Sequence, residues 1–321
     1  MNHRIFSKFT LGFFLVYSAC TSLIPIKVGP PSDIQVKATE ERIKRGEYLA
    51  NNVTVCIDCH STRNWDLYTG PIISGTEGKG GEKFDEEMGL PGTIYAKNIT
   101  PHGIGDWTDG ELARAIVSGV TKDNEALFLM PYEYYNSLHE EDLYSIIAYI
   151  RTLKPIEYDP PKTKLNFPVN YIVRTMPLPY NPPSLPDKSN IVEYGKYMTT
   201  ISGCSGCHTP INKRGQQLPG MEYAGGFEFI FPNGTITRAV NITPDEETGI
   251  GNKSKENFIG IFKAYASEDA KNMKVPEGEG NTTMPWTFYA EMTEEDLGAI
   301  YEYLRTVPPI KNSVEKFGKV D

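Results

Sequence analysis

The chain has 321 residues, about the length of two ordinary domains. Its hydrophobic content of 39%, with 11% aromatic residues, is typical of globular proteins and argues against a wholly disordered chain. The net charge is −9, and because the phosphate backbone attracts cationic surfaces, we expect no nucleic-acid partner.

The first twenty residues indicate export. Arg4 and Lys8 precede a short apolar run over residues 11–17, a pattern typical of a secretory signal and too short to span a membrane. The signal ends in "SAC" at Cys20, which resembles a bacterial lipobox, where the chain is cut before the cysteine and the thiol is acylated. We therefore predict a signal peptide over 1–20 and an exported, periplasm-facing lipoprotein anchored to a membrane surface. A soluble exported protein with a spare cysteine is the alternative.

A tether over residues 21–39 leads to three predicted helices. The first begins near Glu40, in "EERIKRGEYLANN", where apolar residues fall roughly on one face. The second fits "TDGELARAIVSGV", with Thr108 as N-cap, Glu111 in the capping-box position and Gly119 as the stop. The third fits "HEEDLYSIIAYIRTL", whose apolar residues recur at helical spacing.

Prolines then become dense, with nine of the 24 between residues 155 and 186. Such density disfavours a helix, so we predict an extended interdomain linker over 156–187.

Beyond the linker the earlier pattern returns. "RGEYLANNVTVCIDCH" is matched by "YGKYMTTISGCSGCH", "AKNITPHGIG" by "AVNITPDEETGIG", and "LMPYEYYNSLHEEDLYSIIAYIRTLKPI" by "TMPWTFYAEMTEEDLGAIYEYLRTVPPI". The order is shared while the spacing drifts, which indicates one duplicated domain with loop insertions. We predict a first unit over 40–155 and a second over 188–315, each mostly helical with long loops rich in Gly and Pro.

Two runs, "CIDCH" at 56–60 and "CSGCH" at 204–208, contain six of the ten Cys and His residues of the chain. A structural zinc site needs four ligands, and each unit offers no cysteine outside its motif. A thioredoxin-like pair needs a βαβ setting, which the flanking helices do not provide. A bare disulfide explains neither the fixed histidine nor the repetition. Covalent haem attachment explains both, and export matches the compartment where such haem is attached.

We therefore predict two covalently bound haem c groups with iron. The thiols of each motif add to the two vinyl groups of one porphyrin, and the adjacent histidine supplies the proximal iron ligand. The predicted attachment residues are Cys56, Cys59, Cys204 and Cys207, and the predicted proximal ligands are His60 and His208.

The second axial ligand is predicted to be Met130 in the first unit and Met284 in the second. Each begins a Met-Pro-aromatic sequence at the same repeat position, just ahead of the last helix of its unit. The rival ligands are both in the first unit: His102 in the "NITPHGIG" loop, and His139, which aligns with Thr293 at the start of a helix.

The elements "GTIYAKNITPHGIGDW" and "LMPYEYYNSLHEEDLYSIIAYIRTLKPI", taken with the Cys motifs, resemble the cytochrome c subunits of bacterial membrane-bound alcohol and gluconate dehydrogenases and their dihaem relatives. The resemblance implies a mostly α fold of two tandem class-I-type cytochrome c domains with His/Met-ligated haems. Those subunits commonly carry three haem domains, and this chain has two. The second unit also lacks an equivalent of Trp107, which either hydrogen-bonds a haem propionate or packs in the core.

The pattern predicts an electron carrier and no enzyme: an exported dihaem cytochrome that relays single electrons from a donor dehydrogenase to an acceptor cytochrome or oxidase. The resemblance adds the role of electron-accepting subunit of a dehydrogenase. One alternative is a dihaem peroxidase, in which one iron must lose its distal ligand to admit peroxide. Haems that serve only to staple the fold are the other.

Overall fold

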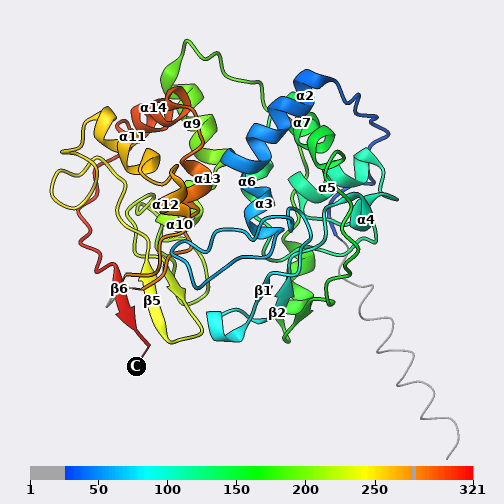
Figure 1. The fold of residues 1–321 in the computed structure, drawn as a ribbon, viewed down its shortest axis with the longest axis horizontal. Coiled ribbons are helices and arrows are strands. Elements are labelled where there is room, and N and C mark those ends of the chain that lie inside the picture. The colour runs from blue at the N-terminus through cyan, green and yellow to red at the C-terminus, as the bar shows by residue number, and fades with distance from the viewer. Residues whose placement is uncertain (1–25, 277–279, 321) are drawn as a thin grey trace, which may run out of the picture.

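The computed structural model describes residues 26–276 and 280–320 (Figure 1). The predicted signal peptide, Cys20 and the start of the tether lie outside the described residues.

Each repeat unit is built around a crossed pair of helices. In the first unit α2 (Glu40–Tyr48) packs against α7 (Glu140–Ile150), and in the second α9 (Ile191–Ile201) packs against α14 (Glu294–Leu304). Glycine makes each crossing close: a Cβ on Gly46 would lie 1.8 Å from the Ser145 carbonyl oxygen. Gly195 is its counterpart in the second unit.

The three helices predicted for the first unit are confirmed. The first, α2, continues as a π-helical segment over Leu49–Val53, and α7 matches the third. The second is α5 (Asp109–Ser118), where Thr108 and Glu111 form both bonds of the capping box. The counterpart of α5 in the second unit is α11 (Lys255–Lys263).

Each unit also carries a small antiparallel sheet. Strands β1 (Lys83–Phe84), β2 (Gly92–Tyr95) and β3 (Lys164–Leu165) form one sheet in that order. The other has the order β4 (Glu228–Ile230), β5 (Thr235–Arg238) and β6 (Phe317–Lys319). In both, the third strand follows the last helix of the unit, so the two sheets repeat the same topology.

The predicted linker differs from a purely extended strap. It contains β3, one helical turn in α8 (Val169–Ile172) and a 3-10 turn over Val173–Thr175. The helical turns form because the segment between Pro168 and Pro177 has no proline, and Pro168 occupies the N-cap, where its missing N–H costs little.

The remaining elements are short and lie near the two Cys motifs and the loops around them. They are α3 (Cys56–Cys59), the 3-10 turn Glu86–Met88, α4 (Pro101–Ile104), α6 (Tyr132–Tyr135), α10 (Cys204–His208), α12 (Glu268–Lys271) and α13 (Trp286–Tyr289).

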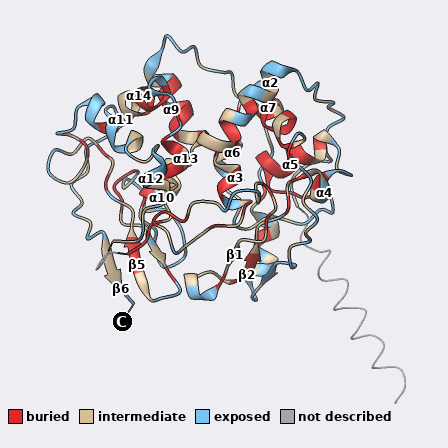
Figure 2. Cartoon of the chain, in the orientation of Figure 1, coloured by how far each residue is buried: buried red, intermediate tan, exposed pale blue. Residues whose placement is uncertain are grey.

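Buried residues are concentrated in the helices α5, α7, α9 and α14 (Figure 2). One continuous apolar cluster runs through both units. Its largest fully buried members are Leu49, Ile57, Leu138, Leu143, Ile146, Ile147, Tyr194, Met198, Ile201, Met292, Leu297 and Leu304. The two units therefore share one core rather than meeting only through the linker.

A reciprocal pair of hydrogen bonds joins the units. The Tyr48 hydroxyl of the first unit donates to Asp296 of the second at 2.5 Å. The Tyr197 hydroxyl of the second unit donates to Asp142 of the first at 2.6 Å. Tyr48 and Tyr197 are equivalent in the repeat, as are the two aspartates, so the units meet through the same surface used twice, as in an isologous dimer.

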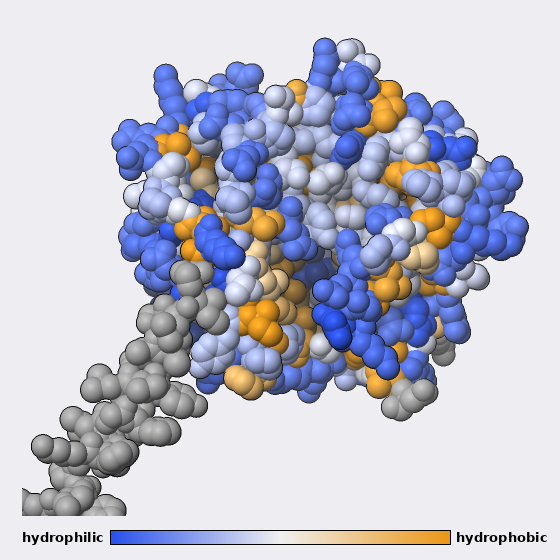
Figure 3. All heavy atoms as spheres, turned by 180° about the vertical axis from the view of Figure 1, so that it is seen from behind, coloured by the Kyte–Doolittle hydropathy of each residue, from blue (hydrophilic) through white to orange (hydrophobic). Residues whose placement is uncertain are grey.

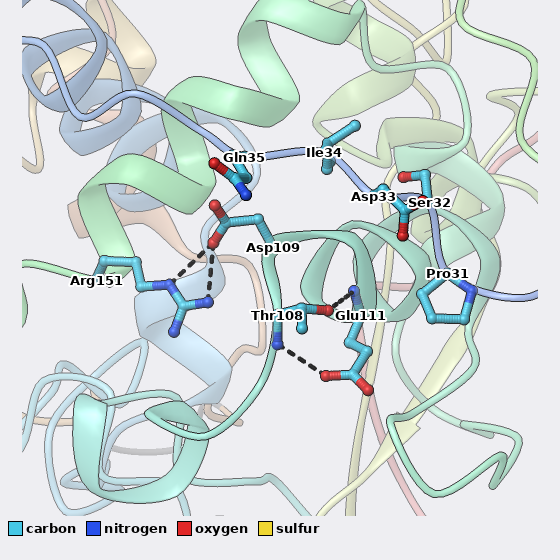
Figure 4. Close-up of a pocket in the computed structure, with 9 residues that line it drawn as sticks. All are labelled: Pro31, Ser32, Asp33, Ile34, Gln35, Thr108, Asp109, Glu111 and Arg151. Carbon is cyan, nitrogen blue, oxygen red and sulfur yellow. Dashed lines mark hydrogen bonds and ion pairs between the residues drawn. The ribbon is translucent and has the colours of Figure 1, made fainter.

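The described part of the tether lies on the first unit. Figure 4 shows residues 31–35 beside the start of α5, around a pocket of about 470 Å³. The Val36 amide donates to Asp109, which is also paired with Arg151 at 2.9 Å. A Cβ on Gly110 would overlap the Ser32 carbonyl, so the tether follows the helix start at backbone contact.

The surface seen from behind is mainly hydrophilic, with apolar residues gathered beside a hollow near its middle (Figure 3). Among the described residues, we find no helix with the length and hydropathy needed to cross a membrane.

Candidate functional site

Both Cys motifs sit on a helical turn that begins after a left-handed residue. Val55 precedes α3 with φ 44°, and Gly203 precedes α10 with φ 67°. The two positions are equivalent in the repeat. Glycine adopts this conformation freely, whereas a β-branched residue is strained there. In the first unit, therefore, the backbone at Val55 is strained, while the turn into the Cys motif has the same left-handed conformation as in the second unit.

The thiols do not resemble a redox pair. All four described cysteines are free, and Cys56 and Cys204 are half-buried against the shared core. Burial raises the pKa of Cys204 to about 12 and also raises that of Cys56. Because a catalytic thiol pair requires a lowered pKa, this setting does not favour thiol–disulfide chemistry.

The two histidines are held identically. Nδ1 of His60 lies 2.7 Å from the Lys97 carbonyl oxygen, and Nδ1 of His208 lies 2.7 Å from the Val240 carbonyl oxygen. A carbonyl can only accept, so each Nδ1 carries the proton and each Nε2 keeps its lone pair. Burial lowers the pKa of both rings, which favours the neutral form that binds metal.

The "NITP" sequence explains how these carbonyls are fixed. Asn98 directly follows Lys97, and its Oδ1 accepts from the backbone N–H and the hydroxyl of Thr100 at 2.9 and 2.7 Å. Its Nδ2 donates to the Ile156 carbonyl, which ties the turn to the segment after α7. Asn241 makes the same contacts, with Thr243 and with the Ile310 carbonyl, in the second unit.

Glycine allows a backbone segment to pass close behind each histidine. The Gly80 amide donates to the His60 carbonyl at 2.8 Å, and a Cβ on Gly80 would lie 2.5 Å from Lys97 backbone atoms. Gly225 repeats the arrangement with His208 at 2.7 Å. Both glycines have positive φ, which other residues rarely adopt.

Each site therefore fits a covalently attached haem c. Two thiols lie on one helical turn, and the next residue is an imidazole whose hydrogen-bonded Nδ1 leaves Nε2 for iron, the arrangement expected of an oriented metal ligand. A haem bound at such a site supplies a one-electron couple between ferrous and ferric iron. Within the described residues, no three His, Cys, Asp or Glu side chains are grouped to hold a bare metal ion.

The Met-Pro sequences have the same local geometry in both units. The Tyr132 amide donates to the Met130 carbonyl at 2.8 Å, and the Trp286 amide donates to the Met284 carbonyl at 2.8 Å. Both methionines are half-buried against the shared core. A one-turn helix, α6 or α13, follows each proline.

Two tyrosines join these Met-Pro helices to the Cys motifs. The Tyr135 hydroxyl donates to the Thr54 carbonyl at 2.6 Å, two residues before the first motif. The Tyr289 hydroxyl donates to the Ser202 carbonyl at 2.8 Å, two residues before the second. Each Met-bearing loop is thereby tied to the Cys motif of its own unit. Neither tyrosine was among the predicted site residues, although their matched positions in the repeat were a usable signal.

The rival histidines have other contacts. His102 Nε2 lies 3.2 Å from Asp159. His139 is the N-cap of α7, and its ring accepts from the Glu141 amide, as its alignment with a helix start suggested. Trp107 packs against the core while its carbonyl accepts from Arg151 at 2.6 Å.

These features define a chain with two equivalent Cys-x-x-Cys-His sites, each with a fixed imidazole, on a mostly helical fold. The comparisons with known proteins agree with that class. The chain's curated homologues are cytochrome c subunits of alcohol, fructose and gluconate dehydrogenases and a diheme cytochrome c, which confirms the resemblance seen in the sequence. No protein-family model matches the chain.

Three relatives show how far the similarity extends. The chain is 29% identical to the cytochrome c subunit of alcohol dehydrogenase (quinone) from Gluconacetobacter polyoxogenes, over 84% of this chain and 57% of the relative. It is 28% identical to the fructose dehydrogenase cytochrome subunit of Gluconobacter japonicus, over 88% of this chain and 56% of the relative. It is 28% identical to a diheme cytochrome c-type protein of Cereibacter sphaeroides, over 80% of this chain and 83% of that protein. The chain thus spans somewhat more than half of the first two relatives and most of the third.

Proposed function

We propose that this protein is an exported dihaem c-type cytochrome, built of two tandem class-I-type domains, that relays single electrons between redox partners. Each motif would bind one haem through its two cysteines. The proposed axial ligands are His60 with Met130 in the first unit and His208 with Met284 in the second.

One observation carries this proposal most strongly: the Cys motif and its imidazole are duplicated with the same orienting bond. Both rings direct Nδ1 to a backbone carbonyl at 2.7 Å, in loops that differ in sequence and length. This is the arrangement expected of two proximal iron ligands, because each must direct Nε2 toward its iron in the same way. The relatives support the same conclusion, since they include a cytochrome c subunit and a diheme cytochrome c-type protein.

We infer that the chain itself is an electron carrier rather than an enzyme. If a methionine fills the second axial position in both units, no position remains for a substrate on either iron. The peroxidase alternative gains no support from the relatives reported above, which are cytochrome subunits or a diheme cytochrome by name.

A dehydrogenase is the electron donor that we propose, because similar chains are cytochrome subunits of alcohol and fructose dehydrogenases. An acceptor cytochrome or oxidase would complete the relay. We propose that acylation at Cys20 anchors the protein to a membrane surface. In that case the tether, which lies against the start of α5, would hold the first unit near the anchor.

The cofactor content can be measured directly. Intact-protein mass spectrometry of the exported protein should show two covalently attached haems per chain. The paired variants Cys56→Ser/Cys59→Ser and Cys204→Ser/Cys207→Ser should each lose one. A wild-type chain with no attached haem, or with one, would contradict the proposal.

A further inference from the structure

A loop of the first unit crosses into the second. Residues 65–70, here called the crossing loop, follow the first Cys motif and lie along residues 273–274 of the second unit. Leu67 forms an isolated antiparallel bridge with Lys274, and the Tyr68 amide donates to the Met273 carbonyl at 2.8 Å. The crossing loop is thereby paired, backbone to backbone, with the segment that leads to the second Met-Pro sequence.

Asn281 completes the junction three residues before Met284. Its Oδ1 accepts from the Thr69 amide at 2.9 Å, and its Nδ2 donates to the Trp65 and Leu67 carbonyls at 3.1 and 3.0 Å. Only 8% of Asn281 is exposed. A buried side chain amide with three cross-unit bonds fixes its own backbone position closely, because each lost bond would leave a buried polar group unpaired.

The crossing loop is itself anchored on the first Cys motif through Arg63. The Arg63 guanidinium donates from Nε to the Gly70 carbonyl at 2.8 Å and from Nη2 to the Thr69 carbonyl at 2.6 Å. Its Nη1 pairs with Asp58 at 3.2 Å, and its Cζ lies 4.0 Å from the centre of the Trp65 ring. Asp58 is part of "CIDCH", so a continuous chain of contacts runs from the first haem attachment sequence to the second Met loop.

The first unit has no matching arrangement at the equivalent positions. The residue equivalent to Asn281 is Leu127, whose amide bonds to the Gly119 carbonyl of its own unit at 2.8 Å. The residues equivalent to Asp58 and Arg63 in the second unit are Gly206 and Ile211. At these equivalent positions of the described residues, the anchored contacts run only from the first unit to the second. Elsewhere the second unit also reaches the first Met-Pro helix, where Gln217 Nε2 donates to the Tyr134 hydroxyl at 3.2 Å.

We propose that the crossing loop, acting through Asn281, positions Met284 for the second iron. Asn281 is a positioning residue in this account. The inference rests on the proposed function, because it assumes that Met284 is an axial ligand. Its consequence is that methionine ligation in the second unit depends on the crossing loop of the first, whereas the loop of Met130 has Leu127 where the second unit has Asn281.

The test uses the full-length protein with haem attached and reads the long-wavelength methionine-to-iron band of the ferric form. In a Met130→Ala background the remaining band reports Met284 alone. Adding Asn281→Leu, which keeps the branched shape of the side chain but removes its hydrogen bonds, should abolish that band. In a Met284→Ala background the same substitution should leave the remaining band unchanged.

A second variant acts from the other end of the contact chain. Asp58→Asn/Arg63→Met removes the anchor of the crossing loop while touching only first-unit residues, so it should also weaken the Met284 band in the Met130→Ala background. This variant applies as well if Asn281→Leu does not fold, as judged by haem attachment and far-ultraviolet circular dichroism. Carbon monoxide binding to the reduced Asn281→Leu protein should rise from none to one per chain.

The outcomes separate this inference from the proposed function. A Met284 band of full intensity in both variants would overturn the inference and leave the dihaem relay intact. Absence of any methionine band in the wild-type protein would contradict the proposed axial ligands, and this inference with them.

Discussion

The two reciprocal tyrosine–aspartate hydrogen bonds between the units should not contribute equally to the free energy of unfolding. Asp296 is 2% exposed and accepts from two hydroxyls, Tyr48 at 2.5 Å and Tyr194 at 2.8 Å. Asp142 accepts from Tyr197 and also from the Arg45 guanidinium, with bonds of 2.8 and 2.9 Å. When the cross-unit tyrosine is changed to phenylalanine, Asp296 therefore keeps one tyrosine hydroxyl as its side chain partner, whereas Asp142 keeps an arginine.

The expected losses of unfolding free energy for the two Tyr→Phe variants follow from this difference. A hydrogen bond to a charged group contributes about 1.5–3 kcal/mol. Tyr48→Phe leaves a buried carboxylate with one neutral partner, so we expect the free energy of unfolding to fall by about 3 kcal/mol, the upper end of this range. Tyr197→Phe leaves Asp142 paired with a cation, so we expect about 1.5 kcal/mol.

The assay is urea unfolding of the haem-loaded protein followed by far-ultraviolet circular dichroism. A matched control is Tyr301→Phe, whose hydroxyl bonds to the neutral Lys253 carbonyl at 2.7 Å and should cost about 1 kcal/mol. Equal losses for Tyr48→Phe and Tyr197→Phe, or a loss for Tyr48→Phe no larger than the control, would refute the reasoning.

Further predictions concern pH, backbone and anchoring. Burial raises the pKa of Tyr134 to about 12, whereas an unfolded tyrosine has a pKa of about 10. The contribution of Tyr134 to the free energy of unfolding should therefore be full below pH 10 and should fall as the pH rises toward 12. Urea unfolding across that pH range measures this change. Gly203→Ala should cost about 1–2 kcal/mol of unfolding free energy from the left-handed backbone alone, because the new Cβ would meet only Tyr134 at an ordinary 3.6 Å, and an unchanged urea midpoint would count against this. Gly195→Ala should lower the free energy of unfolding by about 3 kcal/mol or more, since the new Cβ would lie 1.9 Å from the Ala299 carbonyl oxygen. The control Gly260→Ala in α11 has open space around its Cβ and should be neutral or stabilising. Similar melting temperatures for the two variants would contradict the close helix crossing. Cys20→Ser should move the protein from the membrane fraction to the soluble fraction of cells, and unchanged membrane retention would show that lipidation is not the anchor.

Much of the scaffold could be predicted because local rules determine it. The capping box of α5 and the αL stop at Gly119 are encoded within a dozen residues, and the structure has both. The role of His139 as a helix start was likewise readable from its alignment with Thr293. The first and last helices of the first unit were predicted from apolar spacing, whereas their packing against each other was not.

The parts that escaped prediction depend on backbone atoms or on contacts distant in sequence. The Lys97 and Val240 carbonyls orient the histidines, but a carbonyl has no side chain signal of its own. The contacts of the crossing loop are invisible to repeat analysis because the second unit has Gly206 and Ile211 where the first has Asp58 and Arg63. Asn281 shows no pattern until the fold brings it against residues more than two hundred positions earlier.

Carbon monoxide titration of the fully reduced wild-type protein is the direct test of methionine ligation at both irons. We expect two attached haems that both resist carbon monoxide, because in the proposed ligation Met130 and Met284 would fill the positions opposite His60 and His208. Stoichiometric binding at one haem in the wild-type protein would show an open iron and contradict a simple two-centre relay.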